Sequence, residues 1–194
     1  RLFVAHTHEY VLCFSNRGKA YWLKGYQVPQ GNRNSRGKPI VNVLALEDGE
    51  KISAVLPVKT FDENHYVFMA TADGTVKKTP LVDFSRPREK GIIACELDEG
   101  DYLIGVAITD GRHDVMLFSD EGKAIRFHEE EVRAMGRTAR GVRGITLTEE
   151  AKVVTMLVAG EGDILTATER GYGKRTPLDE YPRKGRGTQG VIAI

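Results

Sequence analysis

Short apolar runs alternate with tight polar turns along the whole chain, and the alternation recurs with a long period. Four segments share one pattern: an apolar run, a serine or threonine, two polar residues and a glycine, followed by a basic or aromatic run. They span residues 10–18, 66–74, 114–122 and 163–171. Their last residues, which we term the anchor glycines, stand 56, 48 and 49 residues apart. A second glycine follows each anchor after 19, 17, 19 and 19 residues, at Gly37, Gly91, Gly141 and Gly190. This register predicts four structural repeats.

Each repeat contains about four short strand candidates. In the third repeat they are 103–108, 115–119, 123–128 and 142–147. The turn 120–122 joins two of them as a hairpin in which the glycine supplies a positive φ. β-Branched residues follow each second glycine, as Ile40-Val41, Ile92-Ile93, Val142 with Ile145, and Val191-Ile192. The sole helix candidate is 129–135, which would form two turns at most.

Repeats of 40–50 residues with four strands each are typical of propeller blades. We therefore expect an all-β, propeller-like or pinwheel array of four-stranded blades, with about four blades in this chain. The whole chain, 1–194, is expected to form one repeat domain with approximate blades 1–50, 51–101, 102–151 and 152–194. Because the pattern begins and stops in mid-repeat, we interpret the chain as an excerpt from a longer array.

Composition sets the environment. The 41% hydrophobic content is enough for a buried core, and no apolar run approaches the roughly 18 residues of a membrane span. Two cysteines, Cys13 and Cys95, lie in separate apolar runs. We expect both to be buried free thiols in a reducing compartment.

The formal net charge is only +1, but the charges are segregated along the sequence. Acidic residues cluster between repeats, at 47–50, 98–101 and 149–150. Cations cluster between the two glycines of each repeat. The candidate binding residues are Arg33, Arg36, Lys38, Arg86, Arg88, Lys90, Arg133, Arg137, Arg140, Arg143, Lys174, Arg175, Arg183, Lys184 and Arg186. In a blade array, equivalent loops fall at equivalent places, so we expect one basic rim and a separate acidic surface.

A basic rim rich in arginine and glycine indicates nucleic-acid binding, since arginine suits bidentate phosphate contacts and glycine permits close backbone approach. The sequence shows no recognition helix and no aromatic platform beside the basic loops, which favours non-specific binding of duplex DNA through its phosphates. Two alternatives stay open: a rim that is merely solvated, and a protein-interaction propeller.

Other chemistry has little support. His6 and His8 have no nearby partner at ligand spacing for zinc, and no glycine precedes Gly18 or Gly122 as a Walker motif requires. Ser15 and Ser119 are explained by hairpin turns, so no catalytic residue is assigned. Trp22 occupies the position that follows its anchor glycine by four, where it could pack in the core or contact a partner.

Several longer motifs carry a family resemblance. They are RLFVAHTH at 1–8, LCFSNRGK at 12–19, SRGKPIVN at 35–42, VFMATADGTVKKT at 67–79, VMLFS at 115–119 and GYGKRT at 171–176. Over its whole length the chain resembles the C-terminal DNA-wrapping domain of the bacterial DNA gyrase A subunit. The corresponding domain of the topoisomerase IV A-type subunit is the alternative within the family.

The resemblance implies a six-bladed β-pinwheel whose blades exchange strands, with this chain as blades two to five. It implies that DNA wraps around a basic perimeter and that the wrap supports negative supercoiling. The parent protein would be an ATP-dependent type IIA topoisomerase in the bacterial cytoplasm, associated with the nucleoid. It would act with the gyrase B subunit in an A2B2 assembly, using ATP and Mg²⁺ through other domains or subunits, with no cofactor and no DNA-cleaving tyrosine in this chain. The family's marker heptapeptide has only degenerate counterparts here, at 34–38 and 183–187.

Overall fold

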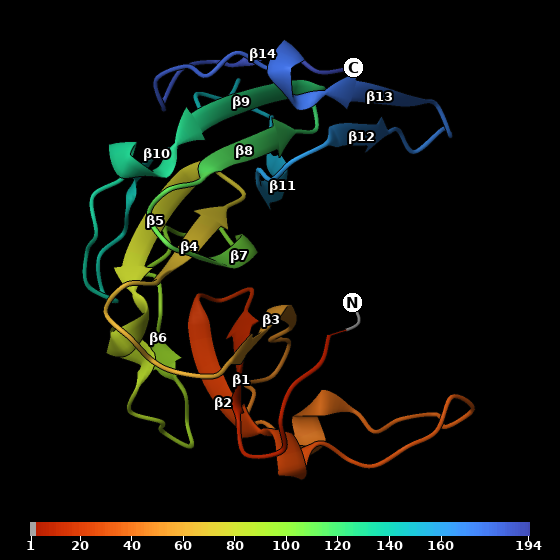
Figure 1. Cartoon of the computed structure of the whole chain (residues 1–194), viewed down its shortest axis with the longest axis vertical. Coiled ribbons are helices and arrows are strands. Elements are labelled where there is room, and N and C mark those ends of the chain that lie inside the picture. The colour runs from red at the N-terminus through yellow and green to blue at the C-terminus, as the bar shows by residue number, and fades with distance from the viewer. Residues whose placement is uncertain (1–2) are drawn as a thin grey trace.

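Residues 3–194 form fourteen β-strands and five short 3₁₀ helices in the computed structural model, arranged as a curved stack of sheets (Figure 1). Three sheets have four antiparallel strands and a fourth has two. Sheet A has the order β3 (Ile52–Val58), β1 (Tyr10–Ser15), β2 (Lys19–Lys24) and β6 (Ile92–Ile93). Sheet B has the order β7 (Leu103–Thr109), β4 (Tyr66–Thr71), β5 (Thr75–Pro80) and β10 (Val142–Arg143). Sheet C has the order β11 (Val153–Val158), β8 (Asp114–Ser119), β9 (Lys123–His128) and β14 (Val191–Ile192). Sheet D is the hairpin of β12 (Asp163–Ala167) and β13 (Gly173–Pro177).

Each four-stranded sheet is completed by the chain of the following repeat. The hairpin β1–β2 pairs with β3 on one side, and on the other side β2 pairs with β6, which follows the next hairpin. The same exchange joins β10 to β5 and β14 to β9. The sheets therefore divide the chain differently from the sequence repeats: sheet A alone draws on residues 10–93. The all-β fold with strand exchange is confirmed.

The strands of the first three hairpins are buried on both faces, because sheets B and C each lie between two others and the second face of sheet A packs against Val43, Leu44 and Leu46. On β4, Val67 and Met69 pack with β1 in one core cluster, whereas Phe68 and Ala70 pack with β8 in the next. Alternate residues of a strand point to opposite faces, so a continuous apolar run supplies both cores. Sheet D packs on one face only, and β12 accordingly alternates between exposed and half-buried residues.

The two recurrent glycines lie where backbones of neighbouring repeats meet. The carbonyl of Gly18 accepts hydrogen bonds from Ala94 N and Cys95 N at 2.8 and 3.0 Å. A Cβ at Gly18 would lie 2.3 Å from the Cys95 carbonyl oxygen. The second glycines behave alike: a Cβ at Gly91, Gly141 or Gly190 would lie 2.9, 2.5 or 2.4 Å from a carbonyl oxygen of the preceding hairpin. All of these glycines have positive φ, so both conformation and space require glycine.

Three local expectations differ from the structure. Ile40–Asn42 is a 3₁₀ helix (η2) rather than a strand, because β6, β10 and β14 each pair with a preceding hairpin and residues 3–39 contain none before β1. The strand expected over 142–147 is limited to β10, since Gly144 N turns to the Gly74 carbonyl. The helix expected over 129–135 is a single 3₁₀ turn, η4 (Glu129–Glu131), after which Met135 N bonds to the Lys78 carbonyl.

The remaining 3₁₀ helices are equally short: η1 (Gly25–Gln27), η3 (Leu81–Phe84) and η5 (Leu178–Glu180). Within the described chain, no helix has the length and apolar character that crossing a bilayer requires. Apart from η2, each follows the second strand of a hairpin, and η3, η4 and η5 lead into the segments that reach the neighbouring sheet.

Replacing Gly18 with alanine should destabilise the fold far more than replacing Gly171. Both residues have positive φ (74° and 83°), but a Cβ at Gly171 meets nothing within 4 Å. We expect Gly171→Ala to cost about 1 kcal/mol and Gly18→Ala at least about 3 kcal/mol, since the Cys95 backbone must also move. Denaturant unfolding of the two variants checks this. Equal losses would show that the close approach does not constrain the fold.

Candidate nucleic-acid interface

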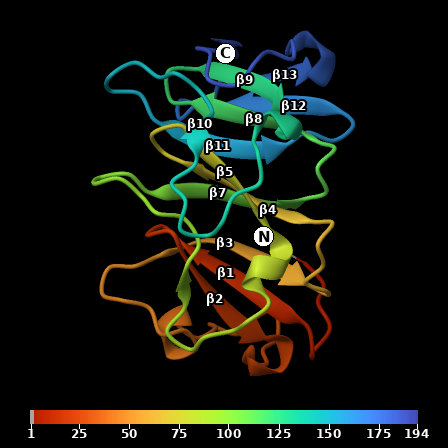
Figure 2. The ribbon, with the colours of Figure 1, turned by 90° about the vertical axis from the view of Figure 1, so that its left-hand side faces the viewer.

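Three of the four basic segments cross the convex side of the stack. Residues 85–91, 132–141 and 182–190 each connect a 3₁₀ helix to the two-residue strand donated to the preceding sheet. Each segment must therefore span the gap between two sheets. Figure 1 shows these connections on the left-hand, outer side of the arc, and Figure 2 looks directly onto that side.

Neighbouring basic segments also contact one another. The Arg137 guanidinium donates from Nη1 to the Ile93 carbonyl at 3.3 Å. The Arg186 guanidinium donates from Nε to the Glu131 carbonyl and from Nη1 to the Arg143 carbonyl, both at 2.9 Å. The convex side is therefore one continuous surface over three repeats, which we call the basic rim (85–91, 132–143 and 182–190).

The basic segment of the first repeat lies elsewhere. Residues 28–42 are exposed throughout, and in Figure 1 this loop projects away from the sheets at the lower right. A Cβ at Gly37 meets nothing within 4 Å, unlike its equivalents Gly91, Gly141 and Gly190. The expectation that all four loops occupy equivalent places is therefore wrong for Arg33, Arg36 and Lys38.

Most of the candidate cations are free. Ten have exposed side chains that form no ion pair within residues 3–194: Arg33, Arg36, Lys38, Arg86, Arg88, Lys90, Arg133, Arg143, Lys174 and Lys184. Six of these ten lie on the basic rim. Free cations in exposed loops retain their full capacity to contact phosphates.

The other five candidates are engaged within the protein. Arg140 pairs with Asp98 and Glu96, and Arg183 pairs with the buried Asp114 at 2.9 Å. Arg137 and Arg186 make the backbone contacts described above, and Arg175 pairs with Asp163 at 3.1 Å across its own hairpin. Surface pairs of this kind exchange readily, so the exposed Arg140 can still turn to a phosphate.

A series of side chains outside the rim joins each repeat to the next. The residue four after the anchor glycine donates to a main-chain carbonyl at the following 3₁₀ helix. Trp22 Nε1 reaches Phe84 O at 2.8 Å, Lys78 Nζ reaches Glu129 O at 2.9 Å and Arg126 Nη1 reaches Leu178 O at 2.9 Å. This assigns Trp22, which the sequence left undecided, to packing between repeats. Arg175 occupies the equivalent position in the fourth repeat, on β13 rather than in a loop.

Lys77 lies beneath the basic rim and was not found by sequence reasoning. Its side chain is buried, and its ammonium group donates to the Ala94 carbonyl at 2.6 Å and to the Arg137 carbonyl. Burial lowers the pKa of Lys77 to about 8. A buried lysine that bonds only to carbonyls carries no sequence signature beyond its place in an apolar strand.

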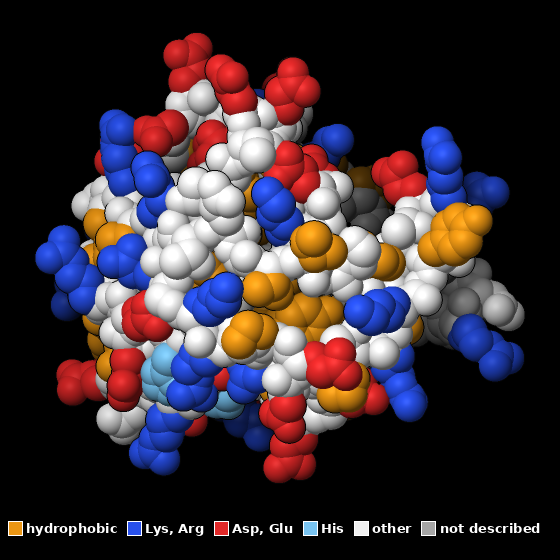
Figure 3. Space-filling view, turned by 90° about the horizontal axis from the view of Figure 1, so that it is seen from above, with side chains coloured by type: hydrophobic (Ala, Val, Ile, Leu, Met, Phe, Trp, Pro, Cys, Tyr) orange, Lys and Arg blue, Asp and Glu red, His pale blue; other side chains and the backbone are white. Residues whose placement is uncertain are grey.

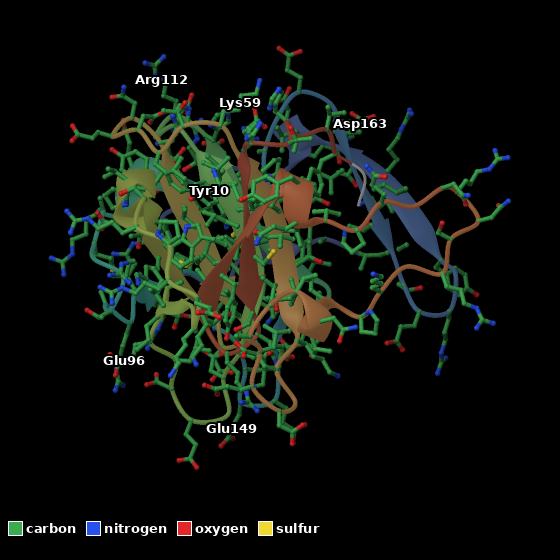
Figure 4. The ribbon with its side chains drawn as sticks, turned by 90° about the horizontal axis from the view of Figure 1, so that it is seen from below. Tyr10, Lys59, Glu96, Arg112, Glu149 and Asp163 are labelled. Carbon is green, nitrogen blue, oxygen red and sulfur yellow. The ribbon has the colours of Figure 1, made fainter. Side chains whose placement is uncertain are left out.

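Acidic residues lie mainly away from the rim. They gather at the hairpin ends along one flat face of the stack, where they pair with Arg17, Lys19, Arg140 and Lys152. Figure 4 shows Glu96 and Glu149 on this face, and Lys59, Arg112 and Asp163 on the opposite one. In Figure 3 lysine and arginine side chains are frequent on the left-hand convex side, and acidic side chains lie at both the upper and the lower edge. The charges are therefore only partly separated.

One further polar cluster has a structural explanation. Ligand atoms of Asp110, His113 and Glu129 lie within 4.8 Å of one another. The fully buried Glu129 carboxylate already accepts hydrogen bonds from Thr109 Oγ1 at 2.6 Å and from His113 N at 2.9 Å. The cluster therefore fixes the turn before β8. Cys13 and Cys95 are both buried and unpaired, as expected, and burial raises both thiol pKa values.

The strand-exchanged sheets and the basic convex edge define a β-pinwheel domain, the propeller class in which each blade is completed by its neighbour. The family model described as "DNA gyrase C-terminal domain, beta-propeller" matches residues 9–59, 65–110, 113–159 and 162–194. This chain belongs to the DNA gyrase C-terminal domain family.

Similar proteins agree with this assignment. The chain is 62% identical over its whole length to the DNA gyrase A subunit of Klebsiella oxytoca and 57% identical to that of Escherichia coli strain K12. In both comparisons it spans 22% of the relative's length. Among solved structures it resembles the C-terminal domain of DNA topoisomerase IV (TM-score 0.88, 29% identity) and the DNA gyrase A C-terminal domain (TM-score 0.81, 28% identity). Both matches cover 96% of this chain, and 58% and 60% of those chains.

The buried Lys77 gives the fold a specific pH dependence. Its pKa is about 8 in the folded protein and near the ordinary 10.5 when unfolded, so the unfolded chain binds more protons between these values. The free energy of unfolding should therefore gain about 1 kcal/mol from this group as pH rises from 8 to 9. Denaturant unfolding of the wild type and of Lys77→Met, which cannot titrate, measures the difference. A gain of the same size in both proteins would assign the effect to other groups.

Proposed function

We propose that this domain binds double-stranded DNA without sequence preference along the basic rim and bends it around the convex side. The observation that carries the proposal is the continuity of the rim: cations from three successive repeats share one curved surface. The name shared by the relatives, that of the DNA gyrase A subunit, supports the same function.

Phosphate contacts account for this mode of binding. The duplex backbone presents a dense row of charges, and cations that neutralise them release counterions. Residues 3–194 contain no α-helix that could enter the major groove. The domain therefore lacks the element that usually reads base sequence there. Bending a 20–30 base-pair segment by 40–90° costs roughly 1–6 kcal/mol, which several phosphate contacts offset.

By its family the domain would act as part of a larger enzyme. We infer that it bends DNA for negative supercoiling by gyrase, joined to the remainder of the gyrase A polypeptide and to the gyrase B subunit in an A2B2 assembly. ATP and Mg²⁺ would be used elsewhere in that assembly, in the bacterial cytoplasm at the nucleoid. Supercoiling by the whole enzyme with and without this domain tests the inference.

The affinity for duplex DNA should depend steeply on salt. Six free rim cations (Arg86, Arg88, Lys90, Arg133, Arg143 and Lys184) predict a slope of about −5 for log affinity against log salt concentration, at −0.9 per phosphate. Fluorescence anisotropy with a mixed-sequence duplex gives the slope. A slope near zero, or selective capture of a protein ligand in place of DNA, would favour a protein-interaction propeller.

Adding cations to the flat face should not mimic the rim. Replacing Glu149 and Glu150 with lysine adds charge on the flat face (Figure 4), where Glu149 shares a hollow with Arg143 but lies outside the crossing segments, so the affinity should change less than about threefold. Replacing Arg88 and Arg133 with glutamine should instead lower the salt slope by about 2. If the lysine variant gains as much affinity as the rim variant loses, bulk charge alone governs binding.

A further inference from the structure

A hollow opens on the basic rim at the joint between the second and third repeats. It is lined by Val82, Asp83, Ser85 and Arg86 from one repeat and by Arg137 and Thr138 from the next. Both arginines thus reach the same space from different sheets. The hollow also contains two hydroxyl groups, which can donate to an anion.

The charge in and below the hollow is positive. The buried Lys77 ammonium lies close beneath, bonded to the Arg137 carbonyl. Asp83 is the one acid in the lining, and its charge acts on Lys77, whose pKa it raises against the opposing effects of burial and Arg137. Within the described residues neither arginine forms an ion pair with Asp83, so both guanidinium groups keep donors for a ligand.

We propose that Arg86 and Arg137 together hold a single DNA phosphate in this hollow, with Ser85 and Thr138 as further donors. The proposal rests on the function proposed above and specifies one of its contacts. Arg86 is exposed and forms no ion pair within the described residues. The Arg137 guanidinium has five N–H donors and uses one of them in the hydrogen bond to the Ile93 carbonyl, so four remain for a ligand. Two planar forks can therefore converge on one phosphate.

The next joint shows why the clamp is local. The residue equivalent to Arg137 in the fourth repeat is Arg186, whose guanidinium donates to the Glu131 and Arg143 carbonyls. Glu131 also accepts from Arg186 N at 2.8 Å, so the protein itself fills that joint. Between the second and third repeats Arg137 makes the equivalent of the Arg143 contact, to the Ile93 carbonyl, but within the described residues it makes no bond to Asp83, the equivalent of Glu131. A phosphate bound there would bridge two repeats and resist any change in the angle between them.

A double-mutant cycle on salt dependence tests the shared phosphate. Arg86→Gln, Arg137→Gln and the double variant are compared with the wild type, using a mixed-sequence duplex of roughly 30 base pairs. If one phosphate is shared, each single variant retains most of the slope and the double variant loses about 0.9. A loss of about 1.8 in the double variant, divided equally between the singles, would mean two separate phosphates and overturn the proposal.

Arg88 and Arg143 are the matched control. Both are exposed rim arginines without an ion pair in the described chain, and they line different hollows. Their double glutamine variant should lose about 1.8 from the slope, additively. If the control variant loses this slope but the Arg86/Arg137 double variant leaves the slope unchanged, the shared phosphate site is absent, while DNA binding along the basic rim is still supported. If neither pair moves the slope, the proposed DNA-binding function fails as well. Unchanged thermal unfolding of each variant confirms that the fold survives.

Discussion

Close approach of backbone between neighbouring repeats is the constraint on which the rest of the structure depends. At Gly18, Gly74 and Gly122, main-chain carbonyls accept hydrogen bonds from the next repeat, and an added Cβ would crowd that repeat. At Gly91, Gly141 and Gly190 the returning chain passes a carbonyl of the preceding hairpin just as closely. These two contacts fix how far each sheet lies from the next. They also oblige the basic segments to cross the convex side.

Sequence pattern predicted the parts of this fold that are local. The repeat register, the hairpins and the second glycines follow from residues close together in the chain, and all are present in the structure. Which strand completes which sheet is a relation between repeats, so Ile40-Val41 resembles Ile92-Ile93 in sequence yet forms a 3₁₀ turn. The same reason separates Arg33, Arg36 and Lys38 from the rim. The contacts of Lys77 and Trp22 are to residues far away in the sequence, so no local pattern predicts them.

The charge distribution makes the near-neutral net charge compatible with the proposed binding of DNA. Some of the acidic groups at the hairpin ends pair with Arg17, Lys19, Arg140 and Lys152. Within the protein, the buried Lys78 and the half-buried Arg126 bind main-chain carbonyls of the next repeat. Cations that remain free are concentrated where the chain crosses between sheets. Lys78 and Arg126 thus join repeats from outside the rim, whereas Arg137, Arg183 and Arg186 are rim residues that also contact the preceding repeat.

Strand exchange also has a consequence for synthesis on the ribosome. The hairpin β1–β2 ends at Lys24, but its last partner strand is Ile92–Ile93. At roughly 5–20 residues per second, the edge of β2 stays unpaired for several seconds after the hairpin has been made. Each later hairpin likewise stays unpaired at one edge until the following repeat has been synthesised. The domain is therefore completed in vectorial order, and during translation one sheet edge at a time must be kept from pairing with other nascent chains.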